Sequence, residues 1–238
     1  MEFKRLSHNS DPFQTDTKIA ETKKASNRMI LAIVYVSEAA RKSVASALLD
    51  LASNLPSRLL HTFEDIQYNR TSFFFASELN NAKDLTNSII KFSDFAFKVI
   101  NFIDHVGCHP TLGSLDHICI SPLGDGASID EVAGFSQQFA IEYSDHHKIP
   151  VFCYGKASST GRKLKDIRKS LGYFTNPLVL PTSYSDEMRQ ADHGASHYDP
   201  AKGMTCIGML LLITVNPIYL SYYKYVYLIA WQVLSRSY

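Results

Sequence analysis

From residue 29 to about residue 171, apolar runs alternate with amphipathic segments, and this pattern predicts strands and helices. The predicted strands are short apolar or alternating runs bounded by polar residues, at 29–36, 59–63, 71–77, 115–122 and 151–154. The predicted helices carry apolar residues at helical spacing, at 38–53, 82–106, 128–144 and 162–171. Because hairpin-like and crossover connections both occur in this order, we expect an α+β fold whose mixed sheet has helices packed mainly on one face.

Two serines are predicted to begin helices. Ser37 follows the first strand and can act as the N-cap of the helix at 38–53. Ser128 precedes Asp130 and Glu131, whose negative charges complement the N-terminal dipole of the next helix. The polar stretch 64–70 is predicted to be a loop.

The chain divides by composition into four segments. Residues 1–28 are polar and mixed in charge, which is typical of a disordered arm, and residues 29–174 hold the predicted strands and helices. Residues 175–203 are rich in Pro, Ser, Asp and His, as a linker or long loop would be. Residues 204–238 form an apolar, Tyr-rich tail.

Three interpretations of this tail remain open. In the first, which we prefer, residues 204–215 form a strand that completes the sheet. In the second, the tail is a weak membrane anchor kinked at Pro217, although the apolar run 207–215 is far shorter than the roughly 20 residues that span a bilayer. In the third, the tail derives from alternative splicing and has no evolved fold.

Charge and cysteine content narrow the class of protein. The 24 Lys and Arg residues nearly balance the 23 Asp and Glu residues, so no basic excess points to a nucleic-acid partner. Four cysteines without paired spacing argue against a disulfide scaffold. The polar N-terminal arm lacks the apolar core of a secretory signal, so we expect a cytoplasmic protein and no membrane partner.

The segment 107–116, GCHPTLGSLD, is the first candidate for chemistry. His109 precedes Pro110, which favours an extended backbone, and Gly107 and Gly113 permit sharp bends. An imidazole with an ordinary pKa of about 6.5 suits a general base, and Asp116 is near enough in sequence to orient it. The alternative is a structural loop histidine that bonds to the backbone.

Two further segments could bind anions. Arg70, next to Asn69 at a predicted strand start, could hold a carboxylate through two hydrogen bonds, and the alternative is a surface turn. Tyr154 and Gly155 end a strand just before basic residues and could contact an anion, the alternative again being a turn.

Histidines four or fewer residues apart occur at 105 and 109, at 146 and 147, and at 193 and 197. None comes with a helical HExxH pattern or a cysteine pair, so solvated or core histidines are the better interpretation and no metal is predicted.

Several stretches together resemble a known family: VYVSEAARK, FEDIQYNRT, GCHPTLGSLDHICISPL, VFCYGKA and GRKLKDIRKSLGYF. In this order, from about residue 30 to residue 203, they resemble the N-terminal subdomain of glutamate formiminotransferase, the folate-dependent half of formiminotransferase-cyclodeaminase. The short formiminotransferase-like proteins of plants look most similar.

The resemblance implies a ferredoxin-like arrangement of the sheet and its helices. It also implies transfer of a formimino group from N-formiminoglutamate to N5 of tetrahydrofolate, which acts as co-substrate. The residues that match the family's catalytic positions are His109, as general base, and Asp116. The expected substrate- and folate-binding residues are Asp65, Asn69, Arg70, Gly113, Tyr154 and Gly155. Family enzymes are dimeric, so a homodimer or a pairing with a full-length relative is expected.

The chain also departs from the family pattern. Residues 34–39 replace a PNFSEG-like turn, and residues 64–68 replace a DxDxGPS stretch, where Asp65 is the candidate substitute. The family-like sequence gives way to the tail after Gly203, where a second subdomain would begin. The alternative function is therefore a non-catalytic folate-binding or oligomerisation module derived from the enzyme.

Overall fold

A computed structural model describes residues 28–124, 126–173, 186–194 and 196–209. Its strands form one sheet in the order β2-β3-β1-β4-β6-β5. They are β1 (Met29–Val36), β2 (Arg58–Asp65), β3 (Arg70–Glu78), β4 (Leu115–Leu123), β5 (Val151–Gly155) and β6 (Thr205–Met209). The helices are α1 (Lys42–Ser53), α2 (Ala82–Val99), α3 (Ile129–His147) and α4 (Leu164–Ser170), with short 3-10 turns at Leu79–Asn81, Phe102–Asp104 and Met188–Gln190.

The sheet is mixed, as the sequence predicted. In its first part β1 pairs antiparallel with both β3 and β4, and β2 pairs antiparallel with β3. The unit β1-α1-β2-β3-α2-β4 therefore has the split βαβ arrangement of ferredoxin-like folds. Beyond β4, strand β6 runs parallel to both β4 and β5 and lies between them.

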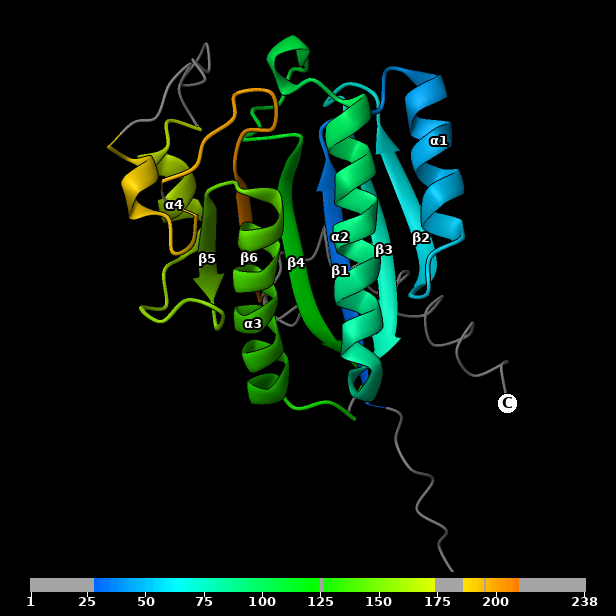
Figure 1. Ribbon diagram of the computed structural model, residues 1–238, viewed down its shortest axis with the longest axis vertical. Helices are drawn as coiled ribbons and strands as arrows, with labels where there is room; N and C mark the ends of the chain where they lie inside the picture. Colours follow the sequence, from blue (N-terminus) through cyan, green and yellow to red (C-terminus); the bar gives the residue numbers. More distant parts are fainter. Residues whose placement is uncertain (1–27, 125, 174–185, 195, 210–238) are drawn as a thin grey trace, which may run out of the picture.

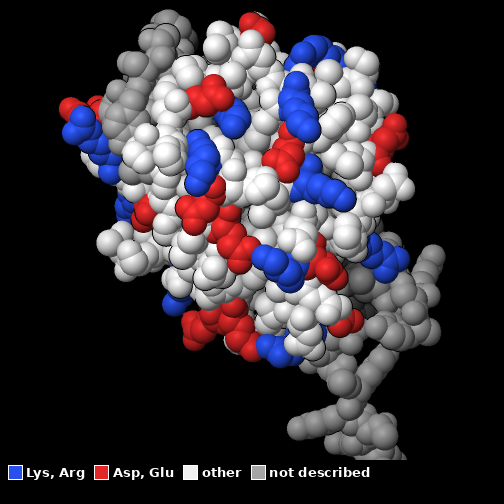
Figure 2. All heavy atoms as spheres, viewed as in Figure 1, with Lys and Arg blue, Asp and Glu red and all other residues white. Residues whose placement is uncertain are grey.

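Helices α1, α2 and α3 cover one face of the sheet (Figure 1). Alternate side chains of each strand point to opposite faces, so Val151 and Cys153 of β5 join the core under these helices. Phe152 and Tyr154 point to the other face, where they pack with Ile167 of α4. Helices thus lie mainly on one face, as expected, and α4 packs on the other face near β5. Figure 2 shows acidic and basic side chains intermixed over the three-helix face.

Helix α2 is shorter than the sequence pattern predicted. The expected helix 82–106 ends at Val99, because Ile100 takes extended backbone angles (φ −114°, ψ 116°). The apolar spacing that suggested a longer helix continues to Ile103 and Val106, yet these side chains are 64% and 82% exposed. The shorter helix frees residues 100–114 to form the loop that carries His109.

The expected cap at Ser37 is also wrong. Helix α1 begins four residues later, at Lys42, after an N-cap residue, Arg41, whose side chain makes no capping hydrogen bond. The Ser37 hydroxyl instead donates to the carbonyl of Gly113 over 2.7 Å, which ties the end of β1 to the loop before β4. In contrast, Ser128 caps α3 as predicted and forms a capping box with Glu131.

The predicted loop 64–70 contracts to a turn. Glu64 and Asp65 belong to β2, and Arg70 begins β3, so a turn of four residues remains at 66–69. Asn69 closes the turn with a φ of 49°, a left-handed conformation that asparagine tolerates better than most residues.

The described part of the segment 186–203 is packed onto the sheet. Asp192 accepts a hydrogen bond from the backbone N–H of Cys153 over 2.7 Å, and His193 forms a bridge with Val151. The strand interpretation of the tail holds for β6, while residues 1–27 and 210–238 lie outside the described residues. Among the residues described, no helix is both long and apolar enough to cross a bilayer. The division into four segments stays a prediction.

Candidate active site

His109 lies in the loop before β4. Its Nδ1 is 2.8 Å from the carbonyl oxygen of Pro110 and 3.2 Å from the hydroxyl of Tyr173. The ring packs against Tyr68, with ring centroids 4.4 Å apart. Because a carbonyl oxygen only accepts hydrogen bonds, its short contact assigns the ring proton to Nδ1. Nε2 then carries the lone pair, which a general base requires.

The surroundings of His109 keep the ring neutral. Partial burial lowers its pKa from the ordinary 6.5, and the positive charges of Arg70 and Arg168 lower it further. The Pro110 carbonyl and the Asp116 carboxylate act in the opposite direction, but the pKa remains lowered overall. A neutral imidazole is the form that accepts a proton.

Asp116, just inside β4, is fully buried. Its Oδ2 accepts hydrogen bonds from Arg168 over 2.9 Å and from Arg70 over 3.3 Å, and its Oδ1 accepts one from the backbone N–H of Leu112 over 2.8 Å. Burial alone would raise the pKa of this carboxyl group, but the two guanidinium groups and the Leu112 N–H hold it below its usual value.

Arg70 stands between the two predicted catalytic residues. Its Nη2 is 3.3 Å from Nδ1 of His109 and 3.3 Å from Oδ2 of Asp116. The same nitrogen is 3.2 Å from the Pro110 carbonyl and 3.4 Å from the Tyr173 hydroxyl. With the ring proton on Nδ1, the 3.3 Å approach of the guanidinium to this nitrogen is a contact and not a hydrogen bond. Arg70 therefore lies between Asp116 and His109, and Asp116 makes no hydrogen bond to His109. The predicted proximity of His109, Arg70 and Asp116 is present in the fold.

Three residues of the cluster were not singled out from the sequence: Tyr68, Arg168 and Tyr173. Arg168 of α4 reaches Asp116 and lies 4.5 Å from the centre of the Tyr173 ring. The sequence of the segment 162–171 indicated a basic helix face or an anion contact, and it formed part of a family-like stretch, but no role was assigned to Arg168. Ile167 fixes how α4 packs, and this packing turns the neighbouring Arg168 inward.

Asn69 and Asp65 shape the turn between β2 and β3. The Asn69 side chain accepts hydrogen bonds from the N–H groups of Ala39 and Ala40 at 2.7 and 2.9 Å, and it donates to the Val106 carbonyl at 3.0 Å. Asp65 accepts one from the N–H of Tyr68 at 2.9 Å. In this structure both side chains brace the segment that presents Tyr68 and Arg70.

The two glycines predicted to bind substrate lie at close backbone approaches. A Cβ atom on Gly113 would lie 2.4 Å from the carbonyl oxygen of Met204. One on Gly155, whose φ is +61°, would lie 2.3 Å from the carbonyl oxygen of Met209. Both positions therefore require glycine for packing against the segment that contains β6.

Tyr154 is buried and its hydroxyl lies 2.6 Å from Nε2 of His117. The His117 ring stacks on Tyr35, with centroids 5.0 Å apart. Burial is the main cause that lowers the pKa of His117 to about 3, so this histidine is neutral. No hydrogen bond joins this pair to His109 in the described residues.

A pocket of about 250 Å³ lies beside the His109 loop. Its lining includes Asn69, the buried Glu38 with its ion-pair partner Arg41, and His105. Burial lowers the pKa of His105, whose Nε2 makes no hydrogen bond within the described residues. His109 is not among the residues that line this pocket.

Comparisons with known proteins show which family the chain resembles. Residues 29–210 match the family model described as formiminotransferase domain, N-terminal subdomain. A formiminotransferase cyclodeaminase-like protein of Arabidopsis thaliana is 34% identical over 183 residues, which cover 74% of this chain and 61% of the relative. Formimidoyltransferase-cyclodeaminases of Dictyostelium discoideum and Sus scrofa are 28% and 27% identical, over 62% of this chain in each case.

The matched part of the chain spans 61% of the length of the plant relative and 27% of the length of the other two. The family model, however, covers every described strand and helix, including β6 and the loop of His109. The chain therefore belongs to the family of the formiminotransferase domain, N-terminal subdomain.

Proposed function

We propose that this chain catalyses transfer of the formimino group from N-formiminoglutamate to N5 of tetrahydrofolate, with His109 as general base. The observation that carries the proposal is the 2.8 Å contact between Nδ1 of His109 and the Pro110 carbonyl oxygen, in surroundings that lower the pKa of the ring. Tetrahydrofolate is the proposed co-substrate, as the resemblance to the formiminotransferase family implies. The four cysteines are free thiols, as the reducing cytoplasm favours.

In the proposed reaction, one proton moves from N5 of tetrahydrofolate to the leaving glutamate by way of His109. The lone pair of N5 attacks the formimino carbon, and Nε2 of His109 takes the proton that N5 loses. The imidazolium then gives this proton to the amine nitrogen of glutamate as its bond to the formimino carbon breaks. A group that is neutral at rest can perform both steps.

Arg70 is the proposed anchor for a substrate carboxylate. Its side chain is 14% exposed, and within the described part of the chain all its hydrogen bonds use Nη2. Nη1 and Nε are the donors that would hold a carboxylate, while Asp116 and the Pro110 carbonyl fix the plane of the guanidinium.

The test compares His109→Ala with His197→Ala in a formiminoglutamate and tetrahydrofolate turnover assay. His197 is an exposed histidine in the segment before β6, so it controls for the loss of an imidazole. His109→Ala is expected to abolish turnover while circular dichroism stays unchanged, and His197→Ala is expected to retain it. Equal turnover in the His109→Ala variant and the unmodified chain would rule out the general-base role.

One observation favours a second candidate, a non-catalytic folate-binding or oligomerisation module. No carboxylate bonds directly to His109 in the described residues, because Asp116 is occupied by Arg70, Arg168 and the Leu112 N–H. Calorimetry with tetrahydrofolate and light scattering separate the two candidates. Binding or self-association without turnover would support the module, and turnover by the purified chain would rule it out.

A further inference from the structure

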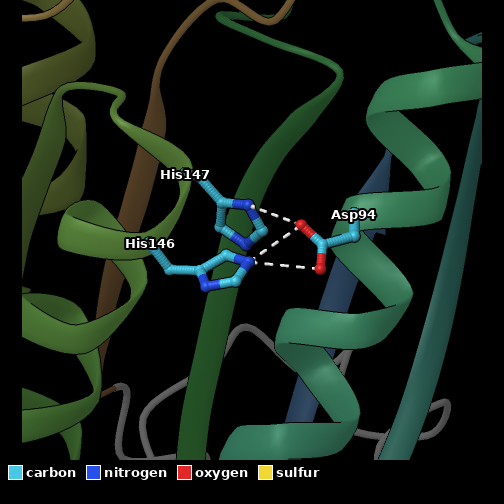
Figure 3. A group of neighbouring side chains, drawn as sticks. All are labelled: Asp94, His146 and His147. Carbon is cyan, nitrogen blue, oxygen red and sulfur yellow. Dashed lines mark hydrogen bonds and ion pairs between the residues drawn. The ribbon is translucent and has the colours of Figure 1, made fainter.

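Three potential metal ligands meet in the helix layer, between α2 and α3. Asp94 lies on α2, and His146 and His147 are the last two residues of α3. Figure 3 shows both imidazoles directed at the same carboxylate from the neighbouring helix. One ligand atom from each residue lies within 4.8 Å of the other two.

The distances fit a tetrahedral metal site. Nε2 of His146 is 3.0 Å from Oδ1 of Asp94, and Nδ1 of His147 is 3.5 Å from the same oxygen. Bonds of about 2.0–2.1 Å at tetrahedral angles place two ligand atoms roughly 3.3 Å apart. The separations between the carboxylate oxygen and each ring nitrogen lie on either side of that value.

His147 is prepared to act as a ligand. Its side chain is 2% exposed, and burial is the main cause that lowers its pKa to about 3, outweighing the Asp94 charge, which raises it. The charges of His146 and Lys202 lower this pKa further. Nδ1 lies 3.5 Å from Oδ1 of Asp94 and can bind a cation between them when the hydrogen of the ring is on Nε2.

The rest of the His147 ring is held by packing. It contacts Phe97 and Tyr143 edge to face, with centroids 5.1 and 4.4 Å away, and its Nε2 makes no hydrogen bond within the described residues. The ring is thus fixed with Nδ1 directed at Asp94.

We propose that Asp94, His146 and His147 bind a divalent cation of the zinc class, such as Zn²⁺ or Co²⁺. Two imidazoles and a carboxylate form a donor set that suits these ions and leaves a fourth position for water. The Asp94 and His146 side chains are 42% and 47% exposed, so that position faces solvent. The ion links the C-terminal end of α3 to α2.

Lys202 places a positive charge close to the site. Its Nζ donates to the His147 carbonyl over 3.2 Å and lies 5.6 Å from the centre of the Phe97 ring. These contacts hold the ammonium group beside the His147 carbonyl and the Phe97 ring. The carboxylate of Asp94 offsets the charge of the bound ion.

The test is zinc binding by the full, tag-free chain, measured by calorimetry and by metal analysis after dialysis. One equivalent is expected. The visible spectrum of the Co²⁺ form is expected to show the intense bands of four-coordinate cobalt. Asp94→Asn and His146→Ala are each expected to weaken zinc binding at least tenfold. Zinc is expected to raise the Tm of the unmodified chain and not that of the variants.

Asp145→Asn is the matched control, because it removes the same charge from the residue next to the cluster. It is expected to bind zinc as the unmodified chain does. Absence of stoichiometric binding, or an equal loss in Asp145→Asn and Asp94→Asn, would overturn the proposal. The His146 side chain is partly exposed, and Asp94→Asn preserves the shape of the side chain. Both variants are therefore expected to fold. Formimino transfer can fail without affecting this result, since the test measures metal alone.

Discussion

Arg168 donates a hydrogen bond to Asp116 across 2.9 Å, joining a fully buried carboxylate of β4 to helix α4. The two residues are 52 positions apart, and Arg70 adds a second guanidinium to the same oxygen. Through Asp116, the two arginines connect the start of β4, just after the His109 loop, to α4 and to β3. The effects expected of substitutions at Asp116 and Arg168 follow from this pairing.

Asp116→Asn should lower the free energy of unfolding by about 3–5 kcal/mol, because it leaves two guanidinium groups without their buried partner. Urea denaturation measures this change. Glu64→Gln is the control: it breaks the exposed ion pair with Lys42, and such pairs contribute less than about 1 kcal/mol. Similar losses in the two variants would show that the burial of Asp116 does not govern its contribution.

The Asp116 carboxylate should also make the free energy of unfolding depend on pH in the acidic range. Its folded pKa lies below the ordinary 3.8, so its contribution is complete above that value and is lost as pH falls through the folded pKa. Urea unfolding of the unmodified chain between pH 6 and pH 2 should therefore show a decline that is shallower in Asp116→Asn. Parallel curves for the two proteins would contradict this assignment.

The pKa of His109 predicts where the acidic limb of the pH profile lies. Because burial and the two arginines lower this pKa, protonation of the base should reduce kcat/KM only below pH 6.5. Removing a neighbouring positive charge with Arg168→Gln should move the limb upward. A profile whose acidic limb lies above pH 6.5, or does not respond to Arg168→Gln, would argue against His109 as the titrating group.

Gly155→Ala should destabilise the fold by more than about 2 kcal/mol, since its φ is positive and a Cβ would collide with the Met209 carbonyl. Gly134→Ala is the matched control, because this glycine lies in α3 with open space around it. It should stabilise the protein by about 0.5–1 kcal/mol through helix propensity. Thermal unfolding of both variants tests the pair, and a neutral Gly155→Ala would refute the close approach.

The predictions from the sequence were correct where the structure depends on neighbouring residues. The apolar run of β1 was predicted with its observed ends, and the cap at Ser128 was correct, since both depend on neighbouring residues. The end of α2 was wrong because Ile103 and Val106 continue a helical spacing without being buried. Ser37 was misread because its hydroxyl bonds to Gly113, 76 residues away.

The candidate site shows the same difference between features set by neighbouring residues and features set by distant contacts. His109, Arg70 and Asp116 were recognised from motifs, but their arrangement around one guanidinium depends on how β3 and β4 flank β1. Arg168 and Tyr173 enter through the packing of α4, which no spacing in the sequence encodes. Asp94 likewise lies 52 residues from His146 and meets it only when α2 packs against α3.

The position of β6 has a consequence for synthesis of the protein on the ribosome. This strand is made after β5 and yet lies between β4 and β5. A nascent chain that has emerged only as far as residue 204 holds β4 and β5 connected through α3, with no backbone pairing between them. The antiparallel unit β1–β4 can form earlier, because domains assemble from the N-terminal side during translation. The contact of Arg168 with Asp116 spans this gap, so the site becomes rigid only when translation has passed Met209.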